Sequence, residues 1–323
     1  MLTSPRSRGP SPKRSALSGS ASFDPDGLHV ASDLHPVLQP GRVAVITGAA
    51  SGIGRAAALE LARLGLKTAV ADLPACADVL NTLGSELVDI VGEANVLVVP
   101  TDVTDLAAVQ HLRDTVYEHW SEVGVLLNNA GIGGAPRGTS WDGLASWHAV
   151  FAVNLFGVLN VQQTFVPSML HQENQAAIIN TGSKQGITNP HSGNAAYNAS
   201  KAAIKSMTEG LAHELRERPA NVTAHLFMPG YTYTGMTGGG AALSEKPARA
   251  WTAQETVLYM LDRVRAGEFY VLCPDGETER ETDQLRIMWA AADVALGRPP
   301  LSRWHRDYRA LFEEYMREGR EGA

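Results

Sequence analysis

The sequence predicts an α/β fold: a doubly wound parallel sheet of about seven strands, with helices on both faces and a helical C-terminal extension. Short runs rich in Val, Ile and Leu recur along the chain and alternate with stretches of helical spacing. Strands that are apolar along their whole length are typical of a parallel sheet buried on both faces. Right-handed crossovers between such strands produce the doubly wound arrangement.

Seven runs in the middle of the chain have the length and composition of buried strands. They are Val43–Thr47, Lys67–Asp72, Asn95–Thr101, Val123–Asn129, Ala176–Gly182, Val222–Met228 and Glu268–Cys273. The segments between these runs show the apolar spacing of helices, for example Arg55–Leu64 and Ala202–Arg216. We therefore expect residues 41–275 to form one domain that carries the functional site.

The N-terminal segment, residues 1–40, differs from this regular middle. It is rich in Ser and Pro and shows no apolar periodicity, so we expect a disordered arm. Its start is basic, and no acidic residue precedes Asp24. This composition is similar to that of an organellar transit peptide, but the prolines interrupt the amphipathic helix that such a signal needs. Organellar import remains the alternative to a plain arm.

The C-terminal segment, residues 276–323, shows two apolar faces at helical spacing. The first comprises Leu285, Met288, Trp289, Ala292 and Leu296, and the second comprises Trp304, Tyr308, Leu311, Phe312 and Tyr315. We expect a helical extension whose faces pack on the domain or on a second subunit. Direct contact with a substrate is the alternative.

The composition narrows the choice of partners. The hydrophobic share of 44% and charged share of 19% are ordinary for a globular protein, and the net charge of −7 argues against general nucleic-acid binding.

We find no run that approaches the ~18 apolar residues of a membrane-spanning helix, so we expect no membrane insertion. Cys76 and Cys273 indicate two reduced thiols and a cytoplasmic location. No metal-binding spacing of His or Cys is present, so no metal is expected.

A glycine-rich turn follows the first expected strand and leads directly into a helix. Its residues Gly48, Ser51, Gly52, Ile53 and Gly54 are typical of a turn whose backbone N–H groups approach a pyrophosphate. The positive end of the helix dipole adds to the attraction for the anion. The turn therefore predicts a dinucleotide site.

An acidic residue ends the second expected strand. Asp72 lies 18 residues beyond Gly54, where a carboxylate accepts hydrogen bonds from both ribose hydroxyls of the adenosine half. The same charge repels a 2′-phosphate. Because Ser51 is neutral and Leu73 follows the acid, no basic group is placed to receive that phosphate. We expect NAD to be preferred over NADP.

Together with later motifs, this turn resembles the short-chain dehydrogenase/reductase family, in its Thr-Gly-x-x-x-Gly-x-Gly branch. The resemblance extends from about Gly41 to Asp275 and implies a Rossmann-type fold. Seven motifs occur in the family's order: Thr47 to Gly54, Asp102-Val103, Asn128-Asn129-Ala130-Gly131, Asn154, Ser183, Tyr197 with Lys201, and Pro229-Gly230 with Thr234. Any one of them could arise by chance, but the ordered set is specific.

The resemblance implies which residues contact the cofactor. Asp102 and Val103 correspond to the pair that contacts the adenine ring. The remaining implied cofactor contacts are Gly48, Ser51, Gly52, Ile53, Gly54, Asp72, Leu73, Asn129, Ala130, Gly131, Tyr197, Lys201, Pro229, Gly230, Thr232 and Thr234.

The expected chemistry is hydride transfer between nicotinamide and an alcohol or ketone, with Tyr197 as acid/base. Tyr197 and Lys201 are four residues apart on an expected helix and share a face. The ammonium of Lys201 favours the phenolate, which lowers a pKa that is ordinarily near 10. Ser183 is expected to hydrogen-bond the substrate oxygen. The resemblance implies that Lys201 binds the nicotinamide ribose and that Asn154 connects it to solvent through water.

Three segments are expected to border the substrate. By resemblance, Gly235–Ala250 is a mobile lid. Lys184–Ala196 lies between Ser183 and Tyr197 in the sequence, and its His191 is either a substrate contact or an exposed loop residue. Tyr231 and Tyr233 could form an aromatic wall.

Members of the family usually form dimers or tetramers through long helices such as Tyr197–Arg216, so a homo-oligomer is expected. Two alternatives to an alcohol dehydrogenase are considered. The first is an enzyme similar to the nucleotide-sugar epimerases and dehydratases, although those usually have a different glycine spacing. The second is an NAD-sensing protein without turnover. The sequence does not identify the substrate.

Overall fold

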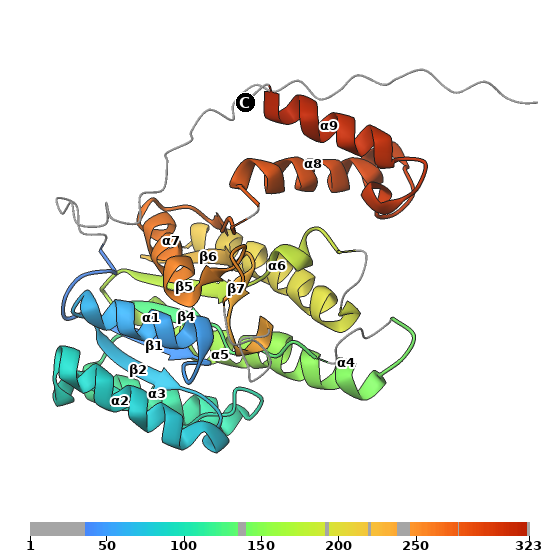
Figure 1. Ribbon diagram of the computed structural model, residues 1–323. Coiled ribbons are helices and arrows are strands. Elements are labelled where there is room, and N and C mark those ends of the chain that lie inside the picture. Colours follow the sequence, from blue (N-terminus) through green and yellow to red (C-terminus); the bar gives the residue numbers. More distant parts are fainter. Residues whose placement is uncertain are drawn as a thin grey trace, which may run out of the picture.

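The computed structural model contains a seven-stranded parallel sheet with helices on both faces (Figure 1). The structure describes residues 36–134, 140–190, 194–218, 221–237, 246–276 and 278–321. The strand order is β3-β2-β1-β4-β5-β6-β9. This arrangement confirms the expected fold class.

The strands coincide with the seven apolar runs of the sequence; two have the expected bounds, and the other five are shorter by one to four residues. Their bounds are β1 Val43–Thr47, β2 Lys67–Ala71, β3 Val96–Val98, β4 Val125–Asn128, β5 Ala176–Thr181, β6 Val222–Met228 and β9 Tyr270–Leu272. Every residue of β1, β4 and β5 is buried. Burial on both faces explains why these strands show no polar alternation.

Side chains of alternate strand residues point to opposite faces of the sheet and fill two separate cores. Ala44 and Ile46 of β1 pack beneath helices α1 (Gly52–Arg63), α2 (Ala77–Val91) and α7 (Ala253–Arg265). Val43 and Val45 pack against α3 (Leu106–Trp120), α5 (Val158–His171) and α6 (Ala195–Arg216). The sheet is thus the middle layer of a three-layer sandwich.

The order of the strands creates a crevice at one edge of the sheet. Strand β1 pairs with β2 on one side, where Ile46 lies opposite Val70, and with β4 on the other, where Ile46 lies opposite Leu127. The chain therefore leaves β1 in one direction and returns to its other side. Ligands of open α/β sheets bind at such a switch point, outside the carboxyl ends of the strands.

One apolar segment combines α4 (Leu144–Phe151), the π-helix η4 (Ala152–Gly157) and α5. It covers Leu144–His171, 28 residues, with a mean hydropathy of 1.5 over its most apolar window, of which 28% is buried. By length and composition it could cross a membrane, which the sequence analysis did not foresee. Here α5 packs into the core beneath the sheet, with Phe165 fully buried. A single segment of this kind is weak evidence for a membrane span.

Regular packing begins before residue 41. Val37 and Leu38 are buried in the core, and Arg42 binds the carbonyl of Pro36 as well as the Glu122 carboxylate at 2.9 Å. The expected disordered arm otherwise covers residues 1–35, which lie outside the described residues. A short parallel pair, β7 (Thr232–Tyr233) with β8 (Trp251–Thr252), was not expected from the sequence.

The C-terminal extension is a helical hairpin, and Figure 1 shows it in red at the top of the molecule. It consists of α8 (Arg280–Leu296), the turn η7 (Ser302–Trp304) and α9 (Arg309–Glu321). Its aromatic residues pack mainly on each other: the Trp289 ring lies 5.3 Å from Phe312 and 5.2 Å from Tyr315. Trp304 belongs to η7, and Tyr308 also precedes α9, so only Leu311, Phe312 and Tyr315 of the expected second face lie on the second helix.

Candidate active site

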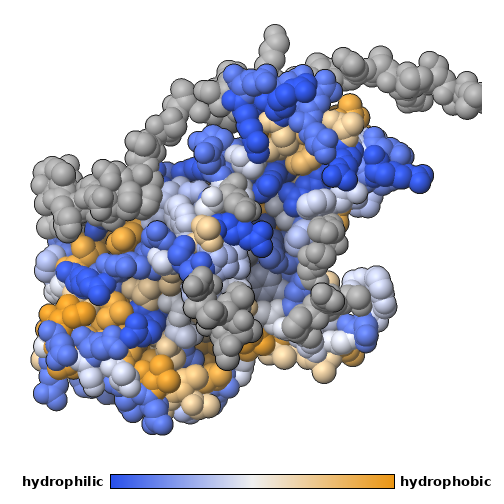
Figure 2. Space-filling view, viewed as in Figure 1, coloured by the Kyte–Doolittle hydropathy of each residue, from blue (hydrophilic) through white to orange (hydrophobic). Residues whose placement is uncertain are grey.

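A cavity of about 540 Å³ opens at the carboxyl edge of the sheet. Figure 2 shows the surface hollowed between the C-terminal helices and the body of the molecule. The cavity is lined by residues that follow β1, β2, β4, β5 and β6. Of the site residues expected from the sequence, all but Gly54 and Asn154 line this cavity. The expected residues that line it are Gly48, Ser51, Gly52, Ile53, Asp72, Leu73, Asp102, Val103, Asn129, Ala130, Gly131, Ser183, Tyr197, Lys201, Pro229, Gly230, Thr232 and Thr234.

The glycine-rich turn is too tight for side chains at two positions. Gly48 has a φ of +68°, and a Cβ there would lie 2.8 Å from the Ala130 Cα. A Cβ on Gly54 would lie 2.0 Å from the Gly48 carbonyl oxygen. Ser51 precedes α1 with its side chain uninvolved in capping. Ser51, Gly52 and Ile53, at the start of α1, line the cavity, so a helix N-terminus without a side-chain cap lies beside it, which fits a pyrophosphate.

The Asp72 carboxylate lies at the expected end of β2. It accepts hydrogen bonds from the backbone N–H groups of Ala50 and Leu73, both at 2.8 Å. These two bonds fix the carboxylate between the glycine turn and the end of β2. A carboxylate has about four acceptor positions, so two remain for a ligand in the cavity.

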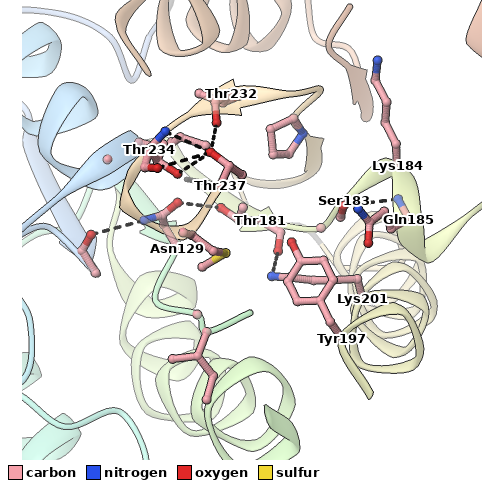
Figure 3. Close-up of a pocket in the computed structure, with 18 of the residues that line it drawn as sticks. Asn129, Thr181, Ser183, Lys184, Gln185, Tyr197, Lys201, Thr232, Thr234 and Thr237 are labelled. Carbon is pink, nitrogen blue, oxygen red and sulfur yellow. Dashed lines mark hydrogen bonds between the residues drawn. The ribbon is translucent and has the colours of Figure 1, made fainter. Parts of the chain in front are cut away.

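A hydrogen-bonded chain joins the ends of three neighbouring strands. The backbone N–H of Asn129 donates to the Thr47 hydroxyl at 3.0 Å, and its side-chain amide donates to the Thr47 carbonyl at 3.3 Å. The Thr181 hydroxyl donates to the Asn129 side-chain oxygen at 3.3 Å (Figure 3). These bonds hold the glycine turn, the end of β4 and the end of β5 in a fixed relation. The dinucleotide cradle and the residues after β5 consequently share one framework.

Ser183, Tyr197 and Lys201 meet beside the end of β5 (Figure 3). Asn194 caps α6 by accepting the Tyr197 N–H at 3.3 Å, which fixes where the first turn begins. Lys201, one turn later, donates from its Nζ to the Thr181 carbonyl at 2.7 Å. The same Nζ lies 5.7 Å from the centroid of the Tyr197 ring. The helix thus brings the phenol and the amine to one side of the cavity, as the four-residue spacing predicts.

Burial shifts both ionisable groups toward their neutral forms. It raises the pKa of Tyr197, and a hydrogen bond with the Ser183 side chain acts in the opposite direction. It lowers the pKa of the Lys201 amine to about 8. The expected lowering of the Tyr197 pKa is therefore not found, because desolvation outweighs the hydrogen bond. The phenol is protonated at neutral pH in this state of the protein.

Asn154 holds the loop after β4 and is not a wall of the cavity. It lies in the π-helix, where its amide oxygen accepts the Ile132 N–H at 2.8 Å and its amide N–H donates to the Ile132 carbonyl at 2.9 Å. A Cβ built on Gly131 would lie 3.3 Å from the Asn154 oxygen and 3.7 Å from the Lys201 Nζ. Asn154 and Lys201 are therefore close neighbours, with no direct hydrogen bond between them. The expected relay through water stays a prediction.

The segments expected to border the substrate contribute unequally. Met236 and Thr237 line the cavity, but residues 238–245 of the expected lid lie outside the described residues, as does His191. Tyr231 lines the cavity. Tyr233 is not among its described lining residues, so the expected aromatic wall has one member there.

Sequence reasoning missed most of a group of charged residues at one side of the cavity. Lys184, directly after Ser183, begins the segment that was expected to border the substrate, and it lines the cavity. The others are far away in the sequence and lie in or near the C-terminal extension: Asp275, Asp283, Arg286 and Arg303. No spacing rule connects them, because tertiary packing alone brings them together. Among the described residues no group of His, Cys, Asp and Glu could hold a metal ion.

Gly54→Ala should weaken dinucleotide binding roughly 10- to 100-fold, since a forced shift in a packed turn costs about 1–3 kcal/mol. The added methyl would displace the Gly48 carbonyl and open the turn. Titration of NADH fluorescence measures the effect. Gly210→Ala in α6 is the control, because nothing lies within 4 Å of a Cβ there. Unchanged affinity in Gly54→Ala would contradict this account of the turn.

Comparisons with known proteins agree with this geometry. The chain is 32% identical over 254 residues to a 1-deoxy-11-beta-hydroxypentalenate dehydrogenase of Streptomyces avermitilis, covering 78% of this chain and 91% of the relative. It is 36% identical over 236 residues to a 3-oxoacyl-(acyl-carrier-protein) reductase of Thermotoga maritima, covering 71% and 85% of the two chains.

Solved structures and a family model give the same result. A short chain dehydrogenase/reductase from Burkholderia phymatum, solved in complex with NAD, matches with a TM-score of 0.70 and 32% identity, covering 81% of this chain and 96% of that one. A model of the short chain dehydrogenase family matches residues 42–242. The chain belongs to the short chain dehydrogenase family and is an oxidoreductase of that family.

Proposed function

We propose that the protein is an NAD-dependent oxidoreductase that interconverts a secondary alcohol and a ketone, with Tyr197 as the acid/base. The observation that carries the proposal is the meeting of Tyr197, Ser183 and Lys201 in the same cavity as the glycine turn. Nicotinamide, when bound, supplies or accepts the hydride, and the protein supplies position and charge.

Tyr197 exchanges the proton of the substrate oxygen. In reduction its protonated phenol donates to the carbonyl oxygen, and the raised pKa of Tyr197 keeps that proton available at neutral pH. In oxidation the phenolate takes the proton of the alcohol. An ammonium at Lys201 offsets the buried negative charge that this direction requires. Ser183, which hydrogen-bonds the phenol, holds the substrate oxygen next to it.

The preference for NAD follows from the charge at the end of β2. The fixed Asp72 carboxylate binds ribose hydroxyls and repels a 2′-phosphate. The cationic residues that line the described cavity, Lys184, Lys201, Arg286 and Arg303, belong to η5 (Lys184–Gly186), α6, α8 and η7. None of them belongs to the turn that contains Asp72. NADP therefore finds no counter-charge beside the adenosine ribose.

The protein is further proposed to act in the cytoplasm as a homodimer or homotetramer. Cys76 and Cys273 are both free thiols, which fits a reducing compartment. The α4–η4–α5 segment keeps large apolar side chains at the surface, including Leu144 and Phe156. Burial of such side chains between subunits is a driving force for association.

Tyr197→Phe should lower kcat by about 100- to 10,000-fold, because it removes general acid–base catalysis. NADH affinity should stay within about threefold of the parent, since the lost hydroxyl is a small part of the cofactor site. Nicotinamide absorbance with a panel of secondary alcohols measures turnover. Tyr117→Phe is the matched control, because Tyr117 is a partly buried phenol outside this cavity. Turnover of Tyr197→Phe within tenfold of the parent would refute the mechanism, and absence of turnover in the parent would favour the sensing alternative.

The parent protein should use NAD at least about 100-fold more efficiently than NADP, because like charges brought together cost several kcal/mol. Asp72→Ala should reduce this ratio by about tenfold or more. The ratio of kcat/KM for the two cofactors is the measurement. Asp78→Asn, which removes an exposed charge nearby on α2, should leave the ratio unchanged. A clear NADP preference in the parent would overturn the assignment of the cofactor.

Light scattering at micromolar concentration should show a dimer or tetramer. Phe156→Asp should shift the mass toward the monomer, because Phe156 is 56% exposed on the apolar segment. Val294→Asp is the control, since Val294 is 88% exposed on α8. A parent protein that is monomeric throughout would contradict the proposed assembly.

A further inference from the structure

The side of the cavity next to Ser183 carries a surplus of positive charge. Three cationic side chains line it, Lys184, Arg286 and Arg303, against two carboxylates, Asp275 and Asp283. The two remaining acids of the cavity, Asp72 and Asp102, follow β2 and β3 at the opposite end. The charged cluster is therefore separate from the proposed adenosine site.

Lys184 pairs with both carboxylates of this cluster. Its Nζ lies 3.1 Å from the Asp275 carboxylate and also pairs with Asp283. Asp275 additionally accepts the Tyr231 N–H at 3.2 Å. Burial raises the pKa of Asp283, so any protonation of this acid would increase the surplus of positive charge. The two carboxylates are thus largely engaged before the arginines are considered.

The two arginines are left with weak partners or none. Arg286 reaches the Asp283 carboxylate and the Thr278 hydroxyl at 3.5 Å, the outer limit of hydrogen bonding. Arg303 has no hydrogen bond or ion pair among the described residues, and its Nε is buried without a partner. Its guanidinium lies 4.5 Å from the centroid of the Trp304 ring. A partly buried guanidinium in this condition is unfavourable unless an anion neutralises it.

The fold holds Arg303 in this position. Ser302, next to it, is fully buried and donates from its backbone N–H to the Asp293 carboxylate at 3.0 Å. The Trp289 indole donates to the Ser302 hydroxyl at 2.7 Å. Leu301 before it has a φ of 55°, a left-handed conformation that is uncommon for a branched residue. The backbone of η7 next to Arg303 is therefore held by buried hydrogen bonds.

Arg286 and Arg303 lie close enough for the charge of Arg286 to affect the pKa of Arg303. Burial and the charge of Arg286 lower the pKa of Arg303 to about 10, so the Arg303 guanidinium remains charged at neutral pH. Arg286 also borders a second hollow. Its other charged lining residues are two arginines, Arg317 and Arg320, and two glutamates, Glu313 and Glu321. Arg303, whose Nε has no partner, lines the active-site cavity and is not among the residues that line the second hollow. Guanidinium groups bind carboxylates through paired hydrogen bonds, and they do so better than ammonium groups.

We propose that the substrate is a hydroxy acid or oxo acid whose carboxylate binds between Arg286 and Arg303. This inference rests on the proposed alcohol–ketone chemistry at Tyr197. In oxidation the alcohol carbon loses a hydride to NAD and its hydroxyl proton goes to Tyr197, and the carboxylate is unchanged. One surplus positive charge matches one carboxylate. The C-terminal extension, which supplies both arginines, is then a determinant of substrate specificity.

The test compares acids with uncharged analogues of the same shape. The hydroxycyclohexanecarboxylates and hydroxybutyrate are assayed beside their methyl esters and beside cyclohexanol, with NAD as the oxidant. We expect kcat/KM for at least one acid to exceed that of its ester roughly tenfold or more, as loss of a charged hydrogen bond implies. Arg303→Gln should raise KM for that acid roughly 10- to 100-fold and leave KM for the ester unchanged. Arg306→Gln is the matched control, because Arg306 is 91% exposed and three residues away.

Stability and binding provide readouts that do not depend on turnover. Arg303→Gln without ligand should melt at or above the temperature of the parent, since it removes a surplus charge. Calorimetry measures the binding of cyclohexanecarboxylate and of cyclohexanecarboxamide to the NADH-saturated protein. Only the carboxylate should bind, and its binding should be lost in Arg303→Gln.

The outcomes separate the two proposals. If the alcohols are oxidised but acids and esters are used equally, or Arg303→Gln preserves the ratio, the carboxylate site is refuted and the alcohol–ketone chemistry stands. If no compound is oxidised but carboxylate binding depends on Arg303, the anion site stands and the proposed reaction is refuted. If no carboxylate in the set binds to or is oxidised by the parent, the carboxylate site is refuted.

Discussion

The parallel pairing of β1 with both β2 and β4 is the constraint on which the rest of the site depends. It brings the carboxyl ends of all the central strands to one edge, where the chain leaves the sheet in opposite directions. Thr47, Asn129 and Thr181 then connect three successive strand ends through side-chain hydrogen bonds. A displacement of any one strand end would therefore move both the dinucleotide turn and the residues around Tyr197.

Desolvation controls the chemistry that this edge can perform. Tyr197 and Lys201 are buried so deeply that each is shifted toward its neutral form. The Tyr197 phenol is neutral at neutral pH, whereas the Lys201 amine, with a pKa of about 8, is still mostly protonated there. The protonation of both groups changes when charge enters the cavity. The same physical effect at Arg303 has the opposite consequence. A guanidinium stays charged, so the surrounding structure favours an incoming anion instead of a change of protonation.

The sequence was sufficient for the fold and for the part of the site that lies on contiguous motifs. Apolar runs predicted all seven strands because strands buried on both faces lack polar alternation. The glycine turn could be recognised in the sequence because Gly48 and Gly54 have no room for a Cβ, so glycine is required at both positions. The direction of the Tyr197 pKa was wrongly expected, because spacing shows a nearby amine but not the depth of burial. The π-helix around Asn154 and the short β7–β8 pair also carry no periodic signal.

The arginines escaped sequence analysis for a related reason. Arg286 and Arg303 are 17 residues apart and belong to different elements of the extension, so nothing in their spacing links them. The extension is built around Trp289, Phe312 and Tyr315, a small aromatic core that the seven-stranded sheet does not share. The hairpin that carries Arg286 and Arg303 therefore packs around its own aromatic residues, while Tyr197 and Lys201 belong to a helix that packs on the sheet. A substitution in the hairpin core can move the arginines and leave the strand ends in place.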